Sequence, residues 1–487
     1  MMKKQKYGLA LAVLVLAVIL VLPTPAALSS AGHRMLGILV FSVIIWMTEA
    51  VSYPVSAALI MSLMAFLLGT APDMANPAKL LGTGAALKLA LSGFANSALA
   101  LVGAALFISA AMMKTGLDKR IALVVLSKIG ARTNRVLAGV IFVGFLLSFF
   151  VPSTTARVSC MVPIVMGIIS AFGVPLKSRF SAIMMIAIAQ ADSVWNVGIK
   201  TAAAQNMIAV GFIEKQLGVY VSWLDWFIAA APFAFIMSIV LYHLLLKLIP
   251  PEMDEIEGGQ ATVAKALANL GPMKPSERKL MIISIVLLFF WATEKILHNF
   301  DTSSTTLVAI TLMMMPGIGI MTWKEAQERI GWGTLILFGV GISLGSAILS
   351  TKAAAWIASC IVDGFGLNDM TAFGIIAVLA AFLIVIHLGF ASATALAAAM
   401  IPIIITVLQG AAEHSALNVV GMTIILQYVI CFGFILPVNA PQNMVAFGTE
   451  TFEARDFIKT GIPLTIIAYA LILLMAATYW KWLGLVL

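Results

Sequence analysis

The chain has few charged residues and few cysteines. Asp, Glu, Lys and Arg make up 10% of its 487 residues, whereas about a quarter of a soluble domain is charged. Hydrophobic residues make up 62% and mean hydropathy is +1.08, which excludes a soluble globular protein and predicts an all-α polytopic protein in the lipid bilayer. Cys160, Cys360 and Cys431 show no metal-ligand spacing, so we expect no disulfide framework, no metal and no cofactor.

The chain contains long apolar runs that could cross a bilayer. A helix needs about 20 apolar residues to cross the hydrocarbon of a bilayer. The first run follows Lys3, Lys4 and Lys6 without a clear cleavage site, so it predicts a retained helix rather than a signal peptide. The runs together predict about eleven transmembrane helices, at 7–22, 34–49, 52–69, 96–113, 180–210, 224–248, 279–298, 304–321, 331–349, 417–448 and 461–486.

The basic residues indicate topology. A net charge of +8 would suggest nucleic acid in a soluble protein, but these cations gather in particular loops, and we expect no nucleic-acid partner. The loop 114–135 holds six of them against a single acid, Asp118, which places it in the cytoplasm by the positive-inside rule. The N-terminus is then cytoplasmic and the C-terminus outside, in a multi-pass protein of the cell membrane.

Short sequence motifs, called repeated words below, recur in the same order in the two halves of the chain. Ala203–Gly211 (AAQNMIAVG) returns as Ala440–Gly448 (APQNMVAFG), and residues shared between 153–163 and 392–402 keep nearly the same spacing. The pattern predicts an N-terminal helix and loop (1–33), two repeats (34–249 and 279–487) and a cytoplasmic linker (250–278). Each repeat holds five predicted crossings, and an odd number obliges the second to be inverted relative to the first.

Two apolar segments, 136–172 and 371–408, are broken near the middle by small polar residues. We interpret both as re-entrant hairpins, the first entering from the cytoplasm and the second from outside, with tips that meet near the midplane. Irregular backbone at that depth must be buried in protein or line a polar cavity.

The hairpin tips and the breaks before Asn206 and Asn443 predict four half-helix N-termini around one ligand. Each N-terminus carries about +0.5 elementary charge, so four amount to roughly +2, which suits a dianion. Capping of the helices alone is the other explanation for the tip hydroxyls. The predicted substrate-binding residues are Ser153, Thr154, Thr155, Thr201, Ala203, Ser392, Ala393, Thr394, Asn439, Ala440 and Pro441.

Through these motifs the chain resembles the divalent anion sodium symporter (DASS) family, the INDY-type dicarboxylate carriers, over nearly its whole length. The resemblance rests on Trp46–Ala50 followed by Pro54, on Gly116–Leu123 (GLDKRIAL), on both tips, and on the two segments ending in Asn206 and Asn443. It implies a homodimer in which a fixed scaffold, including Glu49 and Glu294, carries a mobile transport domain that moves as an elevator. Members carry di- and tricarboxylates or sulfate.

The chain departs from the sodium-coupled members, whose tips read Ser-Asn-Thr, because Thr154 and Ala393 stand in the middle positions. Lys200 lies deep in a crossing, where an ionisable residue needs a partner or a function. A buried pair with Asp192 is one explanation. The other is that Lys200, with His387 in the second half, supplies positive charge in place of sodium, although a lone histidine is more often a core residue. Arg157 could face the ligand, but support of the hairpin from behind is favoured.

We therefore predict a secondary transporter that exchanges C4–C5 dicarboxylates (the succinate, malate, fumarate and 2-oxoglutarate class) without sodium. Sodium-coupled di- or tricarboxylate symport is the nearest alternative. An intramembrane enzyme would use Asp192, Glu49 or Glu294, but an aspartyl protease needs two carboxylates in one site, and the sequence has no second buried Asp motif. A channel is disfavoured because paired hairpins suit alternating access.

Overall fold

The computed structural model describes residues 2–130, 132–171, 173–253 and 259–487. The last residue of the predicted first hairpin and residues 254–258 of the predicted linker lie outside this set. The described residues form helices and connecting loops, with no strand among them, so the predicted all-α class is confirmed.

Helices of the first half begin after α1 (Met2–Val21). In order, they are α2 (Ser30–Thr48), α3 (Tyr53–Leu63), which continues as the π-helix η1 (Met64–Leu68), α4 (Thr83–Leu91), η2 (Ser92–Phe94), α5 (Ser97–Thr115), α6 (Leu117–Ser127), α7 (Thr133–Ser148), α8 (Thr154–Ala171), α9 (Arg179–Gly198), η3 (Lys200–Ala202), α10 (Ala204–Leu217) and α11 (Trp223–Leu248).

Helices of the second half follow the connecting helix α12 (Gly259–Asn269). In order, they are α13 (Pro275–Thr293), α14 (Thr302–Met314), α15 (Trp323–Arg329), α16 (Trp332–Ser350), α17 (Ala353–Phe365), η4 (Leu367–Asp369), α18 (Ala372–His387), α19 (Ala393–Ala412), α20 (Val419–Ile430), η5 (Pro437–Asn439), α21 (Pro441–Phe447), α22 (Ala454–Ala477) and α23 (Tyr479–Trp482). Their order repeats that of the first half, including a short 3₁₀ turn before α10 and again before α21.

Seven helical stretches among the described residues are long and apolar enough to cross a membrane. Other predicted crossings are built from shorter apolar helices, such as α14, or from two short helices joined across a break, as in α20–η5–α21. Helix α9, one of the seven, continues across a similar break through η3 into α10. Seven such stretches support a multi-pass membrane protein, while the number of crossings stays a prediction.

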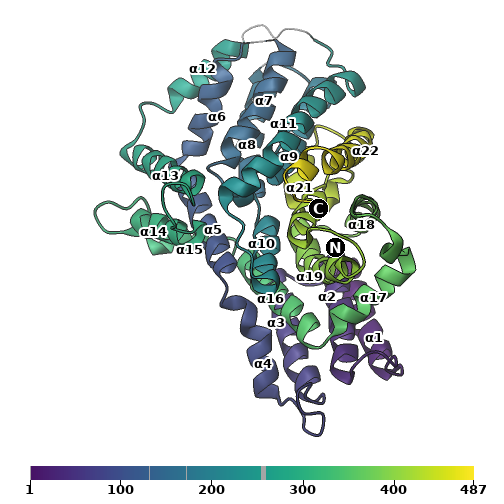
Figure 1. The fold of residues 1–487 in the computed structure, drawn as a ribbon. Helices are drawn as coiled ribbons and strands as arrows, with labels where there is room; N and C mark the ends of the chain where they lie inside the picture. Colours follow the sequence, from purple (N-terminus) through teal and green to yellow (C-terminus); the bar gives the residue numbers. More distant parts are fainter. Residues whose placement is uncertain (1, 131, 172, 254–258) are drawn as a thin grey trace.

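Helix α9 lies in the upper region in Figure 1 and packs against α7, α8, α11 and α21, while α1 to α4 lie at the opposite end. Its residues from Phe180 to Gly198 are all buried. Helices α10, α16 and α19 pack together near the middle of the molecule. The two halves are therefore interleaved there, and residues distant in sequence meet.

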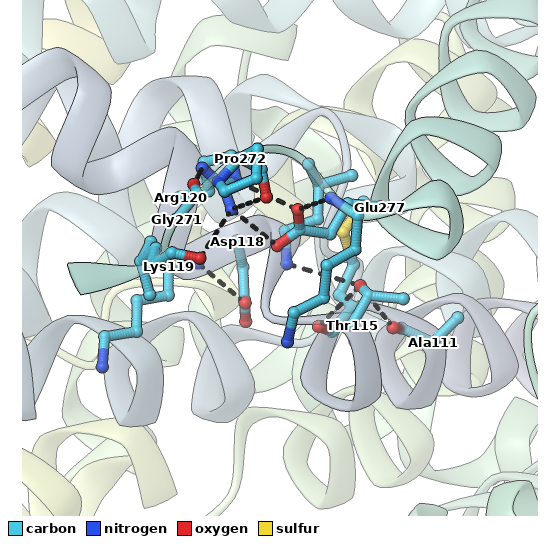
Figure 2. A network of polar contacts seen from close by, with 12 residues as sticks. Ala111, Thr115, Asp118, Lys119, Arg120, Gly271, Pro272 and Glu277 are labelled. Atoms are coloured by element: carbon cyan, nitrogen blue, oxygen red, sulfur yellow. Dashed lines mark hydrogen bonds and ion pairs between the residues drawn. The ribbon is translucent and has the colours of Figure 1, made fainter. Parts of the chain in front are cut away.

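A buried ion pair joins the two halves at the end of the connecting segment (Figure 2). Arg120 on α6 donates from Nε to Glu277 on α13 over 3.1 Å, and from Nη1 to the Gly271 carbonyl over 2.9 Å. Glu277 also accepts the Lys274 backbone N–H over 2.8 Å. Because both charges are paired and hydrogen-bonded, the start of the second half is held against α6.

Candidate functional site

A cavity of about 130 Å³ lies where the two halves meet. Its wall consists of the turns between α7 and α8 and between α18 and α19, the breaks before α10 and α21, and side chains from α3, α5 and α16. Among the described residues that line it, none is Asp, Glu, Lys, Arg or His. The wall thus carries no charged side chain and combines hydroxyl and carboxamide groups with apolar surface.

Four helices begin at this cavity. The first residues of α8, α10, α19 and α21 are Thr154, Ala204, Ala393 and Pro441, and all four line the wall. The first N–H groups of a helix have no partner within it, and each N-terminus carries about +0.5 elementary charge. The arrangement can therefore receive an anion with backbone donors, and no charged side chain is required at the wall.

The two turns are capped in the same way. Ser153 Oγ accepts the Ala156 N–H over 3.4 Å, and Ser392 Oγ accepts the Ala395 N–H over 3.3 Å. In both turns the hydroxyl spans to the third residue after it, and both serines line the cavity. Capping therefore occupies one acceptor position of each serine.

The structure brings most of the predicted substrate-binding residues together. Those that line the cavity are Ser153, Thr154, Thr155, Thr201, Ala203, Ser392, Ala393, Thr394, Ala440 and Pro441. Asn439 is not part of the wall. Its Nδ2 donates to the carbonyls of His387, Leu388 and Phe390, so it holds the second turn against the break before α21.

Asn206 and Asn443 hold the broken segments open. Asn206 Nδ2 donates to the carbonyls of Asn196 over 2.7 Å and Ile199 over 3.2 Å. Asn443 Nδ2 donates to those of Gly433 over 2.7 Å and Leu436 over 3.4 Å, ten and seven residues earlier in both cases. These carbonyls lose helical partners at the break, and the carboxamide replaces them.

Arg157 lies behind the first turn and is fully buried. Its guanidinium donates to the Asp192 carboxylate over 2.5 Å, to the Val151 carbonyl over 2.8 Å and to the Ala202 carbonyl over 3.0 Å. It supports the hairpin from behind, as the sequence favoured. The pairing of Lys200 with Asp192 was wrong, because Asp192 pairs with Arg157, which comes close to it from α8.

Lys200 and His387 lie outside the cavity wall. Lys200 is buried; its Nζ donates to the Val221 carbonyl over 2.6 Å and lies 5.0 Å from the centre of the Tyr220 ring. The ring of His387 is buried, and neither of its nitrogens has a hydrogen-bond partner among the described residues. Both are near the broken segments rather than at the predicted ligand.

Besides apolar residues, four polar residues of the cavity wall were absent from the predicted set: Tyr53 from α3, Thr334 from α16, and Gln205 and Gln442 from the repeated word. The signal for the glutamines was available, because they occupy the same place in both copies of that word. Tyr53 directly precedes Pro54 in a family-like segment, but nothing in that segment shows that it reaches the hairpin turns.

An all-helical fold of apolar crossings, with an uncharged cavity between two helix turns and two broken helices, is typical of a membrane transporter. A family model described as the sodium:sulfate symporter transmembrane region matches residues 3–486. The chain therefore belongs to this family, as its resemblance to the divalent anion sodium symporters predicted, and it is a transporter and not an enzyme.

Individual relatives agree with this membership. A protein of Cupriavidus necator described as "Membrane protein" is 56% identical, covering 98% of this chain and 93% of its own. The sodium-dependent dicarboxylate transporter SdcS of Staphylococcus saprophyticus is 26% identical, covering 97% and 90%. The crystal structure of the Alcanivorax borkumensis YdaH transporter has a similar fold, with a TM-score of 0.55 and 14% identity, covering 89% of this chain and 99% of that one.

Proposed function

We propose that the chain exchanges one C4–C5 dicarboxylate for another across the cell membrane, without sodium. The observation that carries the proposal is the uncharged cavity at which α8, α10, α19 and α21 all begin. Their N-termini together present roughly +2, which matches the charge of succinate, malate, fumarate or 2-oxoglutarate. The name of the SdcS relative supports this substrate class.

Buried charge supports exchange rather than symport. Arg157 and Lys200 are cations buried beside the broken α9–α10 segment, and among the described residues Asp192 is the one carboxylate that contacts either of them. Moving an excess of buried charge through a low-dielectric barrier is unfavourable. This excess of one formal charge adds to the roughly +2 of the four N-termini, and a bound dicarboxylate offsets most of the sum. The loaded carrier therefore crosses readily while the empty carrier does not, and transport becomes obligatory exchange. In this proposal Lys200 and His387 take the place of sodium.

The proposed movement is of the elevator type within a homodimer. The two hairpins and the broken helices, α7–α10 and α18–α21, move with the substrate, and the helices near Glu49 and Glu294 form the scaffold. Repeats at 34–249 and 279–487 are inverted relative to each other, with the segment 250–278 in the cytoplasm. The N-terminus is then cytoplasmic and the C-terminus lies outside.

Reconstituted protein tests the exchange. Proteoliposomes are loaded with succinate, malate or 2-oxoglutarate, or left empty, and uptake of labelled succinate is measured in sodium-free and sodium-containing buffer. We expect uptake only into loaded vesicles, at a rate that sodium does not change. Sodium-driven uptake into empty vesicles would establish sodium-coupled symport instead.

A further inference from the structure

We propose that the Arg157 guanidinium is a built-in cation that fills an oxygen-lined cage beneath the first hairpin turn and positions the ligand-facing donors there. The cage is the set of oxygen atoms from Val151, Asp192, Asn196 and Ala202 that surround the guanidinium. The transport readout of this inference rests on the proposed exchange function.

All five N–H groups of the guanidinium have an oxygen partner. Nε donates to Asp192 Oδ1, Nη1 to the carbonyls of Val151 and Ala202, and Nη2 to the Asp192 carbonyl over 3.4 Å and to Asn196 Oδ1 over 2.8 Å. A guanidinium has five donors in a fixed plane, so the side chain is used completely. The fit leaves Arg157 no donor with which to contact a substrate directly.

Three of the four cage residues, Val151, Asn196 and Ala202, are linked to the cavity wall. Val151 lies in the turn that contains Ser153, and Ala202 precedes Ala203. Asn196 Oδ1 also accepts the Thr154 hydroxyl over 2.8 Å. The guanidinium therefore joins the start of α8 to the break before α10, which are two of the four N-termini at the cavity. Arg157 is thus a positioning residue.

The cage needs a cation because it contains a carboxylate. Asp192 is fully buried, and its Oδ2 has no hydrogen-bond partner among the described residues. Without a positive group, that carboxylate and the converging carbonyl oxygens would be buried unpaired, at a high free-energy cost. Oxygen atoms of this kind also bind small hard cations, so the emptied cage would accept one from solution.

The second half lacks this charge pair. By the spacing of the repeated words, Leu396 and Val429 stand where Arg157 and Asp192 stand in the first half, and both are buried. There the neutral carboxamide of Asn439 donates to the carbonyls of the turn. Leu396→Ala is therefore a matched control that removes a buried side chain without removing a cation.

The test is rescue of Arg157→Ala by small cations. The variant is reconstituted, and succinate exchange is measured with millimolar guanidinium, sodium or choline. We expect at least a tenfold rise in the KM for succinate, with a several-fold recovery by guanidinium or sodium and none by choline. Leu396→Ala should not respond to any of them. An Arg157→Ala carrier with wild-type KM, or a loss that no cation reverses, would overturn the inference.

A binding measurement separates this inference from the exchange proposal. In detergent, guanidinium at the same concentrations should raise the melting temperature of Arg157→Ala but not that of the wild type, whatever the transport mode. If the wild type proved to be a sodium symporter, the exchange proposal would fail, and the melting-temperature result would still test the proposed cage. If Arg157→Ala does not fold, Arg157→Lys decides: its three donors cannot reach all five oxygens, so unchanged KM would overturn the positioning role.

Discussion

The two halves of the molecule attach a hairpin turn to a broken helix by different chemistry. In the first half, Arg157 connects the carbonyls of Val151 and Ala202 and is paired with Asp192. In the second, Asn439 makes the connection with a neutral amide. The same backbone arrangement can therefore be held with or without charge, and the charged version is confined to one half.

This difference shows that holding a turn in place and placing charge beside it are separate roles. A neutral amide satisfies the carbonyls of the second turn, so charge is not needed to hold a turn in place. The charges of Arg157, Asp192 and Lys200 in the first half then have consequences beyond packing, since they set the net charge of the region that the proposed movement carries across the membrane.

The largest effect is expected from substitution of the asparagines that hold the two helix breaks. Asn206→Ala removes donors to three carbonyls and an acceptor for Gln427 and Cys431. Asn443→Ala removes donors to two carbonyls, and its Oδ1 has no partner among the described residues. An unsatisfied buried polar group costs about 1–3 kcal/mol, so both variants should lose stability and exchange, Asn206→Ala more severely.

Melting temperature in detergent and succinate exchange in proteoliposomes measure this ranking. Asn418→Ala is a control, because that asparagine caps α20 away from the breaks. A larger loss for Asn443→Ala than for Asn206→Ala would show that contacts around the two breaks do not determine their stability.

An intermediate effect is expected for Lys200, which has no charged counterpart, since Pro437 occupies its place in the second half. Lys200→Ala should abolish strict exchange or make the carrier leak, because the empty transport domain then has less charge to carry through the barrier. Efflux of labelled succinate into substrate-free buffer measures the leak. Pro437→Ala is the matched control and should retain coupling, whereas wild-type exchange without leak in Lys200→Ala would remove the lysine from the mechanism.

The sequence predicted the positions of the breaks because small polar residues and repeated words interrupt apolar runs. The turns span residues 149–153 and 388–392, so the breaks expected at 152–155 and at 392–394 overlap the end of each turn and the first residues of α8 and α19. Backbone geometry of this kind follows from local residue types, and two copies strengthen a weak signal. Most residues chosen at the four N-termini consequently line one cavity.

The partners of buried charges could not be predicted in the same way. Asp192 lies about two helical turns before Lys200, which suggested a pair within one helix, but Arg157 reaches it from another helix. Likewise, Asn439 was expected at the ligand, yet it contacts the turn of the neighbouring hairpin. Such contacts depend on the packing of elements distant in sequence, and spacing along the chain does not contain that information.

The smallest effect is expected at a cross-half contact on the surface. Lys114 at the end of α5 lies 2.6 Å from Glu325 on α15, and the hydrogen bond from Lys114 lowers the pKa of Glu325 from 4.5 to about 2.

A carboxyl group whose pKa is lower in the folded state stabilises the fold at pH values above its unfolded-state pKa. This contribution is lost as pH falls from 4.5 to about 2. The pair is partly exposed and screened by salt, so Glu325→Gln should lower the melting temperature slightly at neutral pH and leave exchange within about twofold. Melting curves from neutral pH down to about pH 3 should show the difference between variant and wild type shrinking, because protonation removes the same charge. A difference that grows on acidification, or a large loss of exchange, would mean that this contact between the halves does more than hold two surfaces together.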